Sequence, residues 1–262
     1  MTVTINSVRK AKAKLPMRGL FFSPPKIGKT TLASEFPMPI FIQLEEGESQ
    51  GTEFDTFGVL DDYADVSAAL RELATQEHDF KTLVIDTVDA LEPLINKKVC
   101  MDNNWPDIGY PGFGKGYAAA AEVWGKLLNG TNMLRRERGM NIIFLGHSRV
   151  IKFDPPGMDS YNRYTLRTHE RVSNMIMDDV DIIAFINKRA DIKAEEAGFG
   201  NVKKHATGGD TRWIYTEGRP AYEAGSRYDL PGESILRKGT LVADWASRGV
   251  PIAGYTPEKP TT

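Results

Sequence analysis

Short apolar runs and helical patterns alternate along the first 150 residues of the chain. The apolar runs, rich in β-branched and aromatic side chains, predict strands at residues 19–22, 39–44, 57–60, 82–85 and 141–145. Between them, apolar side chains recur at helical spacing and predict helices at residues 30–36, 64–75, 91–99 and 116–138. This alternation predicts an α/β fold with a mostly parallel sheet covered by helices on both faces.

Beyond residue 150 the pattern becomes more polar. The polar stretch at residues 149–168 contains Pro-Pro-Gly at 155–157 and is too long for an ordinary connection, so we expect a functional loop there. The elements expected after it are a helix at 170–177, a buried strand at 180–187, a polar, glycine-containing segment at 190–210, and a β-hairpin of 212–216 with 219–222.

The two ends of the chain differ from its core. The first residues carry Arg9, Lys10, Lys12 and Lys14 among small side chains, and the last nine residues contain two prolines and no apolar pattern. We therefore expect a basic N-terminal arm at 1–17, one core domain at 18–235, and a short C-terminal helix with a loose tail at 236–262.

Composition and charge narrow the class of protein. The 262 residues include 33 basic and 35 acidic side chains, so a nucleic-acid-binding surface would have to be local. The single cysteine, Cys100, excludes an internal disulfide and suits a reducing cytosol. The sequence has no apolar run near the ~18 residues of a membrane span and no signal-peptide pattern at its start. We expect a soluble, cytoplasmic protein with no membrane partner.

A loop between the first strand and the first helix carries the clearest functional pattern. The pattern is a strand, a tight loop that ends in Gly-Lys-Thr, and then a helix, which is the context of a phosphate-binding P-loop. Ser23 takes the place of the usual first glycine. Successive backbone N–H groups cradle phosphates, Lys29 can reach the terminal ones, and the Thr30 hydroxyl can ligate Mg²⁺. The predicted nucleotide-binding residues are Ser23, Pro24, Pro25, Lys26, Ile27, Gly28, Lys29, Thr30 and Thr31.

Three later strands end in polar side chains that can complete this site. Asp86 can hold Mg²⁺ together with Thr30. Either Glu45 or Glu46 can orient or deprotonate the attacking water, and His147 can sense the γ-phosphate. Because ligands bind at the carboxyl ends of strands in open α/β sheets, we expect these side chains to lie together.

Each of these assignments has a structural alternative. An aspartate after an apolar strand can cap the next helix, although Asp89 is better placed than Asp86 to do so. His147 can be a structural histidine with satisfied hydrogen bonds, and at least one of the two glutamates is a surface charge.

In this order, the motifs resemble those of the RecA-like ATPases over roughly residues 17–190. The strand at 41–45 resembles the one that carries the family's catalytic glutamate, which favours Glu45 over Glu46. Residues 83–87 resemble the second Walker motif, and 143–147 resemble the strand ending in a polar switch residue, where His147 replaces the usual glutamine.

More narrowly, the chain resembles phage-encoded AAA-type nucleotide-binding proteins of the Sak group, which are linked to single-strand annealing recombination. The residues that carry this resemblance are Gly-Lys-Gly-Tyr at 114–117, the His147 strand end, and the segment 212–227. A lysine often precedes the Ser-Arg pair of that segment in the group, and here Gly225 takes its place.

The resemblance implies a Mg²⁺-dependent, DNA-stimulated ATPase of phage-type homologous recombination in the cytoplasm of a bacterial host. Lys29, Glu45 and His147 would take the catalytic roles, with Thr30 and Asp86 on the metal. A basic residue from a neighbouring subunit often completes such sites, which implies a filament or a ring. Arg227 is the leading candidate for this finger, ahead of Arg212 and Arg219.

The resemblance also implies two loops that bind single-stranded DNA, with a single-strand-binding or annealing protein as a possible further partner. Cations would bind phosphates and aromatic side chains would stack on bases, unless these residues only pack or solvate a loop. The first loop is 101–115, with Trp105, Tyr110 and Phe113. The predicted contacts of the second loop, 149–171, are Arg149, Lys152, Tyr161, Arg163, Tyr164, Arg167 and Arg171.

Three other functions remain open on sequence grounds. A helicase- or packaging-type motor would share the same core. A nucleotide kinase would need a lid and an acceptor pocket, and the sequence has no arginine-rich lid in the usual strand order. A nucleotide-gated regulatory module with little turnover is compatible with Ser23 and Gly225. Annealing, strand exchange and mediator activity are not distinguished.

Overall fold

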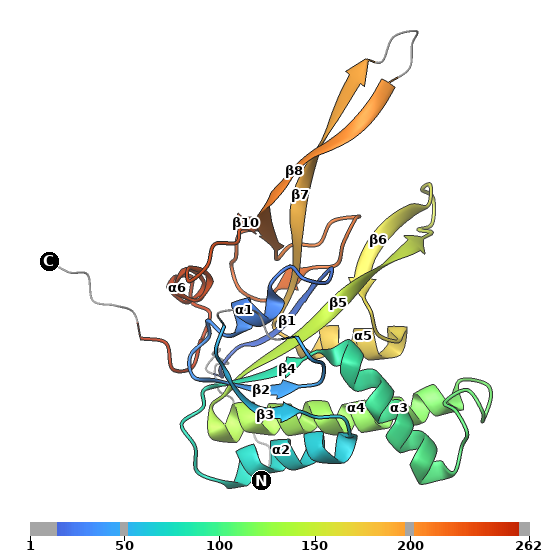
Figure 1. Ribbon diagram of the computed structural model, residues 1–262, viewed down its shortest axis with the longest axis vertical. Coiled ribbons are helices and arrows are strands. Elements are labelled where there is room, and N and C mark those ends of the chain that lie inside the picture. The colour runs from blue at the N-terminus through green and yellow to red at the C-terminus, as the bar shows by residue number, and fades with distance from the viewer. Residues whose placement is uncertain (1–14, 48–51, 197–201, 257–262) are drawn as a thin grey trace, which may run out of the picture.

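The computed structural model describes residues 15–47, 52–196 and 202–256 and shows a mixed α/β fold (Figure 1). The strands are β1 (Arg18–Ser23), β2 (Pro39–Gln43), β3 (Asp55–Val59), β4 (Thr82–Asp86), β5 (Asn141–Phe153), β6 (Tyr161–Leu166), β7 (Ile182–Glu196), β8 (Val202–Tyr215), β9 (Gly225–Ser226) and β10 (Glu233–Ile235). The strand order is β10-β8-β7-β1-β5-β4-β2-β3, and all neighbours from β7 to β3 run parallel.

Helices cover both faces of this sheet. They are α1 (Lys29–Ala33), α2 (Tyr63–Thr75), α3 (Val88–Asn103), α4 (Lys115–Met133) with a π-helical turn at Leu134–Arg138, α5 (Glu170–Asp179) and α6 (Leu241–Ser247). Buried side chains of α2, α3, α4 and α5 share one hydrophobic core, and those of α1 and α6 share the other. The expected fold class is therefore confirmed.

The central strand β1 shows why the apolar runs form buried strands. Leu20 and Phe22 belong to the core under α2 to α5, whereas Phe21 belongs to the core under α1 and α6. Successive side chains of a strand point to opposite faces, so a strand covered on both faces must be apolar throughout. This burial fixes the register that brings Ser23 opposite His147 at the carboxyl end of the sheet.

The expected long loop at 149–168 is wrong, because most of this segment forms a β-hairpin. β5 continues past the sheet to Phe153 and pairs with β6 in antiparallel register, from Ser148 opposite Leu166 to Phe153 opposite Tyr161. The Pro-Pro-Gly sequence lies in the turn, where Gly157 has a φ of 77°. The two strands contain polar residues as well as Val150, Ile151 and aromatic residues, and Val150 is exposed, as expected for a hairpin that stands in solvent.

The polar segment at 190–210 is also a hairpin. β7 and β8 pair in antiparallel register from Phe185 opposite Tyr215 out to Glu196 opposite Val202. Figure 1 shows the β5–β6 and β7–β8 hairpins projecting from the same side of the molecule. The expected pairing of 212–216 with 219–222 is wrong: the end of β8 pairs with β7 and β10, while Arg219 and Tyr222 form an isolated bridge.

The predicted basic arm falls mostly on residues 1–14, and the last six residues of the predicted tail on 257–262; both segments lie outside the described residues. Of the helices in the described part of the chain, none is long and apolar enough to cross a membrane.

Candidate active site

The loop after β1 has the geometry of a phosphate cradle. Ser23 is buried at the end of β1, and Gly28 adopts a left-handed conformation (φ 95°) directly before α1. This φ favours glycine, and a Cβ at Gly28 would also lie 2.6 Å from Nη1 of Arg212, which would then have to move. The start of α1 and its N–H groups are thereby fixed beside the loop.

Lys29 is the buried cation of this loop. Its residue is 6% exposed, and its Nζ donates a hydrogen bond to Ser23 Oγ at 3.3 Å. Burial lowers the pKa of Lys29, against the attraction of the Asp86 carboxylate. A buried ammonium group is stable only with anionic partners, which makes this position suited to a phosphate.

Thr30 and Asp86 bring two oxygen ligands together beside Lys29. Thr30 Oγ1 donates to Asp86 Oδ2 at 2.7 Å, across 56 positions of sequence. Burial raises the pKa of Asp86, and the Thr30 hydrogen bond and the Lys29 charge oppose this shift.

This pair fits Mg²⁺ in a nucleotide site. In phosphate sites Mg²⁺ takes one or two protein ligands and completes its shell with phosphate oxygens and water. Within the described ranges there is no cluster of three or more His, Cys, Asp or Glu that could hold a metal by itself. The donor set formed by Thr30 and Asp86 therefore matches a metal that arrives with a phosphate ligand.

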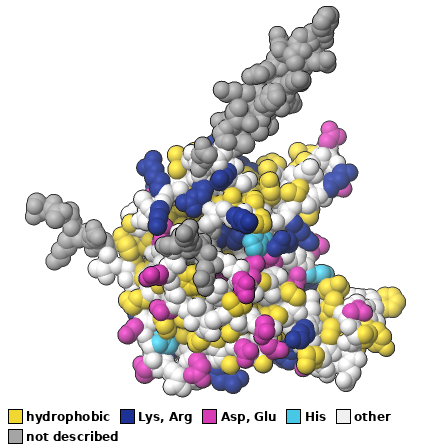
Figure 2. Space-filling view, viewed as in Figure 1, with side chains coloured by type: hydrophobic (Ala, Val, Ile, Leu, Met, Phe, Trp, Pro, Cys, Tyr) yellow, Lys and Arg dark blue, Asp and Glu magenta, His cyan; other side chains and the backbone are white. Residues whose placement is uncertain are grey.

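A cleft of about 470 Å³ opens above these residues, at the carboxyl ends of β1, β2 and β4 and beside His147, where β5 leaves the parallel sheet. Figure 2 shows Lys and Arg side chains gathered on this face over the P-loop and the base of the β5–β6 hairpin, with acidic side chains below them. The cleft, here called the phosphate cleft, is lined by Pro25, Lys26, Gly28, Lys29, Thr30, Gln43, Glu45, Glu46, Gly47, Asp86, Thr87 and His147.

Glu45 and His147 meet on one wall of the phosphate cleft. Glu45 Oε1 accepts a hydrogen bond from Thr87 Oγ1 at 2.6 Å and lies 3.8 Å from His147 Nδ1. Glu46 also lines the cleft, but these contacts belong to Glu45. Thr87 caps α3 by accepting from Ala90 N, so it takes the helix-cap role considered for the aspartates.

Asp89 supports this wall of the phosphate cleft without lining it, and the sequence did not identify it in that role. Its carboxylate accepts hydrogen bonds from His147 N at 2.8 Å, from His147 Nδ1 at 3.0 Å and from Arg167 Nη2 at 2.7 Å. Burial alone would raise the pKa of Asp89, but these hydrogen bonds outweigh it and hold the pKa well below its usual range. Its position in the first turn of α3, three residues after Asp86, was the available signal.

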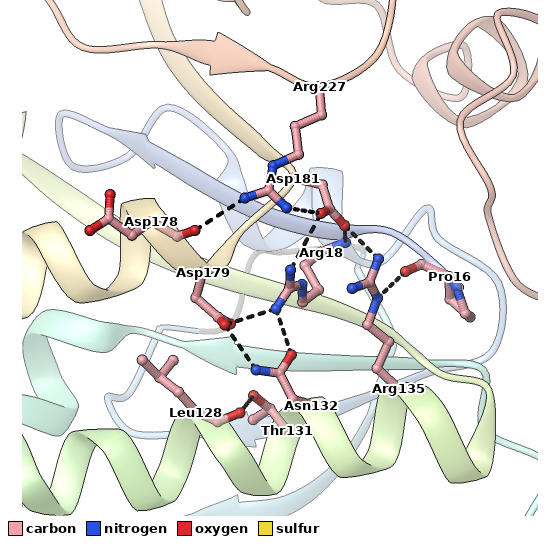
Figure 3. A network of polar contacts seen from close by, with 10 residues as sticks. All are labelled: Pro16, Arg18, Leu128, Thr131, Asn132, Arg135, Asp178, Asp179, Asp181 and Arg227. Carbon is pink, nitrogen blue, oxygen red and sulfur yellow. Dashed lines mark hydrogen bonds and ion pairs between the residues drawn. The ribbon is translucent and has the colours of Figure 1, made fainter. Parts of the chain in front are cut away.

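Two of the three arginines considered as a finger, Arg212 and Arg227, lie at opposite ends of the central strands. Arg212, on β8, donates from Nη1 to Ile27 O at 3.2 Å and so contacts the P-loop of its own chain. Arg227 lies at the amino ends of β1 and β7, where its Nη1 is 3.0 Å from Asp181 Oδ1 (Figure 3). Its side chain is 59% exposed.

Asp181 pairs with several arginines at the amino ends of these strands, and this cluster is here called the Asp181 network. Its carboxylate accepts from the backbone N–H of Arg18 at 3.1 Å and from the guanidinium of Arg135 at 2.7 Å, in addition to Arg227. Arg18 also donates to Asp179 at 2.8 Å, below the sheet (Figure 3).

The predicted polymer contacts differ in exposure and in their partners. Arg149, Lys152, Arg167 and Arg171 are exposed, and of these Arg167 pairs with Asp89. The other three are packed within the chain: Arg163 lies over the Phe153 ring and 3.9 Å from Glu223, Tyr161 packs on Phe153, and Tyr164 packs on Phe185.

The aromatic residues at 101–115 divide in the same way. Tyr110 and Phe113 are exposed, and Phe113 has a left-handed backbone (φ 48°) between two left-handed glycines, Gly112 and Gly114. Trp105 instead packs against the core. This segment therefore presents two aromatic rings to solvent.

The chain was compared with known proteins. A family model described as "AAA domain" matches residues 15–228. Among solved structures, the crystal structure of the RadB recombinase is similar, with a TM-score of 0.47 and 13% sequence identity, over 85% of this chain and 88% of that chain. No curated protein matches the sequence.

Proposed function

Because the chain belongs to the AAA domain family, we propose that it is a Mg²⁺-dependent RecA-like ATPase that acts on single-stranded DNA in phage-type homologous recombination or annealing. The observation that carries the ATPase part is the 2.7 Å contact of Thr30 with Asp86 beside the buried Lys29. A P-loop lysine, a hydroxyl and a carboxylate in one cleft are the parts that bind a nucleoside triphosphate.

In this mechanism the chain mainly positions charges. Lys29 and the backbone N–H groups around Gly28 bind the phosphates, and Thr30 and Asp86 would hold Mg²⁺, which neutralises charge on the phosphate oxygens. Glu45 accepts a proton of the attacking water or orients that water. Its hydrogen bond from Thr87 fixes the carboxylate at the cleft wall.

Arg227 is our proposed finger, and the fold constrains how it could act. It lies at the amino ends of β1 and β7, whereas the phosphate cleft lies at the opposite, carboxyl ends of the parallel strands. Arg227 can therefore reach a phosphate cleft only in a neighbouring subunit. Such a contact joins two different surfaces of the subunit head to tail, and repeating it generates a ring or a filament. Forming that contact requires Arg227 to leave Asp181.

The β5–β6 hairpin, the start of α5 and the 101–115 segment are our proposed DNA contacts. Arg149, Lys152 and Arg171 supply exposed cations for phosphates, and Tyr110 and Phe113 supply exposed faces for base stacking. His147 lies at the root of this hairpin, directly opposite Ser23 of the P-loop strand, so a change at the phosphates has a short path to it. A single-strand-binding or annealing protein is a further proposed partner.

The test is ATP hydrolysis with and without single-stranded DNA, with Lys29→Ala as the blank and Lys126→Ala, an exposed lysine of α4, as the matched control. Strong DNA stimulation in the wild type and in the Lys126→Ala control is the expected result. An ATP hydrolysis rate that does not change with single-stranded DNA would contradict the DNA assignment. Unwinding of a forked duplex would identify a motor. ATP binding without turnover would identify a regulatory module instead.

A further inference from the structure

Two segments of the chain converge on a single buried carboxylate behind the phosphate cleft. The Asp89 side chain is 6% exposed and accepts from the His147 ring at 3.0 Å and from the Arg167 guanidinium at 2.7 Å. His147 lies on β5 where the strand leaves the sheet, and Arg167 directly follows β6. The two partners of Asp89 are therefore the two roots of the β5–β6 hairpin.

The same two roots are joined by the backbone. Arg167 N donates to His147 O at 2.8 Å, and the Asp89 carboxylate also accepts from His147 N at 2.8 Å. The position of the hairpin relative to α3 thus depends on Asp89. Since α3 starts directly after Asp86 and Thr87, this helix also carries the groups that face the phosphate cleft.

Arg167 is linked to the phosphate cleft through one shared atom. Asp89 Oδ2 accepts from both Arg167 Nη2 at 2.7 Å and His147 Nδ1 at 3.0 Å, and His147 lines the cleft. The Arg167 side chain is 49% exposed, so it has room to move. A triphosphate at Lys29 would add negative charge near Arg167 and would compete with Asp89 for this cation.

We propose that Asp89 is a positioning residue that holds His147 and Arg167 together, so that nucleotide in the phosphate cleft changes the state of the β5–β6 hairpin. The inference rests on the proposed nucleotide binding and adds the residue through which the hairpin responds. It also assigns Arg167 to this coupling and not to the polymer. The device is an ion pair and two hydrogen bonds that a nearby anion can redistribute.

The experiment follows amide hydrogen exchange of the hairpin, residues 149–166, in the full chain with and without Mg²⁺ and a non-hydrolysable ATP analogue. In the wild type the analogue should change hairpin exchange by about tenfold. In Asp89→Asn this change should fall below about twofold, while the dissociation constant of the analogue stays within about threefold of wild type. Damage to the fold would instead raise exchange in both states.

Glu92→Gln is the matched control. Glu92 lies one turn further along α3 and accepts a backbone hydrogen bond from His169 N at 2.8 Å, outside the Asp89 cluster. This variant should respond to the analogue like wild type. Arg167→Gln, at an exposed position, should lose the response as Asp89→Asn does, and it serves if Asp89→Asn does not fold.

The outcomes separate this inference from the proposed function. A wild-type chain that does not bind the analogue would contradict nucleotide binding itself. Binding without a change in the hairpin, or an unchanged response in Asp89→Asn or Arg167→Gln, would overturn the Asp89 inference and leave nucleotide binding intact.

Discussion

The two ends of β1 hold two charged clusters of different construction. At its amino end, Asp181 forms ion pairs with Arg18, Arg135 and Arg227 of the same chain, with nitrogen–oxygen distances of 2.7 to 3.4 Å. At its carboxyl end, the buried Lys29 has the Ser23 hydroxyl at 3.3 Å and faces a cleft of about 470 Å³. β1 has six residues at about 3.3 Å per residue. Over this length, the charges at one end are neutralised within the chain, whereas those at the other end face a cleft that can hold a ligand.

The difference shows what identifies a functional charge. Both clusters contain buried ionic groups, so burial alone does not distinguish them. Asp181 has cationic partners within the fold, and its expected contribution is to stability. Lys29, Thr30 and Asp86 surround an open volume with a cation and metal-type oxygen ligands, and their expected contribution is to binding. Substitutions at the two ends should therefore separate stability from nucleotide affinity.

The largest effect should come from Asp181→Asn. Removing this buried carboxylate leaves Arg18 and Arg135 without their shared partner, and breaking a buried ion pair in this way costs about 3–5 kcal/mol. The free energy of unfolding, measured by urea denaturation, should fall by that amount. Nucleotide affinity at temperatures where the variant is folded should stay at the wild-type value. An unchanged urea midpoint would contradict the stabilising role of the Asp181 network.

Lys29→Ala should have the opposite profile. Loss of the P-loop cation should weaken binding of a fluorescent ATP analogue by about 100-fold, or about 2.7 kcal/mol. Stability without nucleotide should not fall, because burial of the ammonium group is itself unfavourable. Lys126→Ala should change neither property. Wild-type affinity in Lys29→Ala would show that the phosphate cleft does not bind phosphate through this residue.

Sequence patterns could predict those parts of the site that follow from local motifs and sheet topology. Gly28, Lys29 and Thr30 are a contiguous motif, and Asp86, Glu45 and His147 each follow an apolar strand, so parallel pairing brings them to one edge. Their catalytic roles stay predictions, but their convergence in one cleft is observed.

The remaining features depend on information that a single sequence does not hold. The β5–β6 and β7–β8 hairpins were missed because residues 149–166 and 190–210 are too polar to show an apolar run. The contacts of Asp89 with Arg167 and of Arg212 with Ile27 join positions 78 and 185 residues apart. Such pairs depend on strand order and side-chain direction, which no local pattern specifies.

Asp89→Asn should have a smaller effect on stability, and this effect should depend on pH. Hydrogen bonds from charged groups contribute about 1.5–3 kcal/mol. The pKa of Asp89 is lowered in the folded state, so the ionised carboxylate stabilises the fold fully above its unfolded pKa of about 4. This contribution of the Asp89 carboxylate is lost as the pH falls below that value toward the lower pKa of the folded state. The difference in unfolding free energy between wild type and Asp89→Asn should therefore be constant from pH 7 to about 5 and shrink below about 4. A difference that grows in acid would contradict this assignment.

Arg227→Ala should have the smallest effect on stability and the most direct bearing on assembly. Its side chain is 59% exposed, and an ion pair at such a position contributes about 0–1 kcal/mol. The urea midpoint should therefore barely move, in contrast to Asp181→Asn, although both changes remove the same ion pair. If Arg227 reaches the phosphate cleft of a neighbouring subunit, ATP turnover should fall steeply while nucleotide affinity stays near wild type. Mixing Arg227→Ala with Lys29→Ala, each inactive alone, should then restore part of the turnover, because some interfaces would pair an intact cleft with an intact finger. Full turnover in Arg227→Ala would limit this arginine to the Asp181 network.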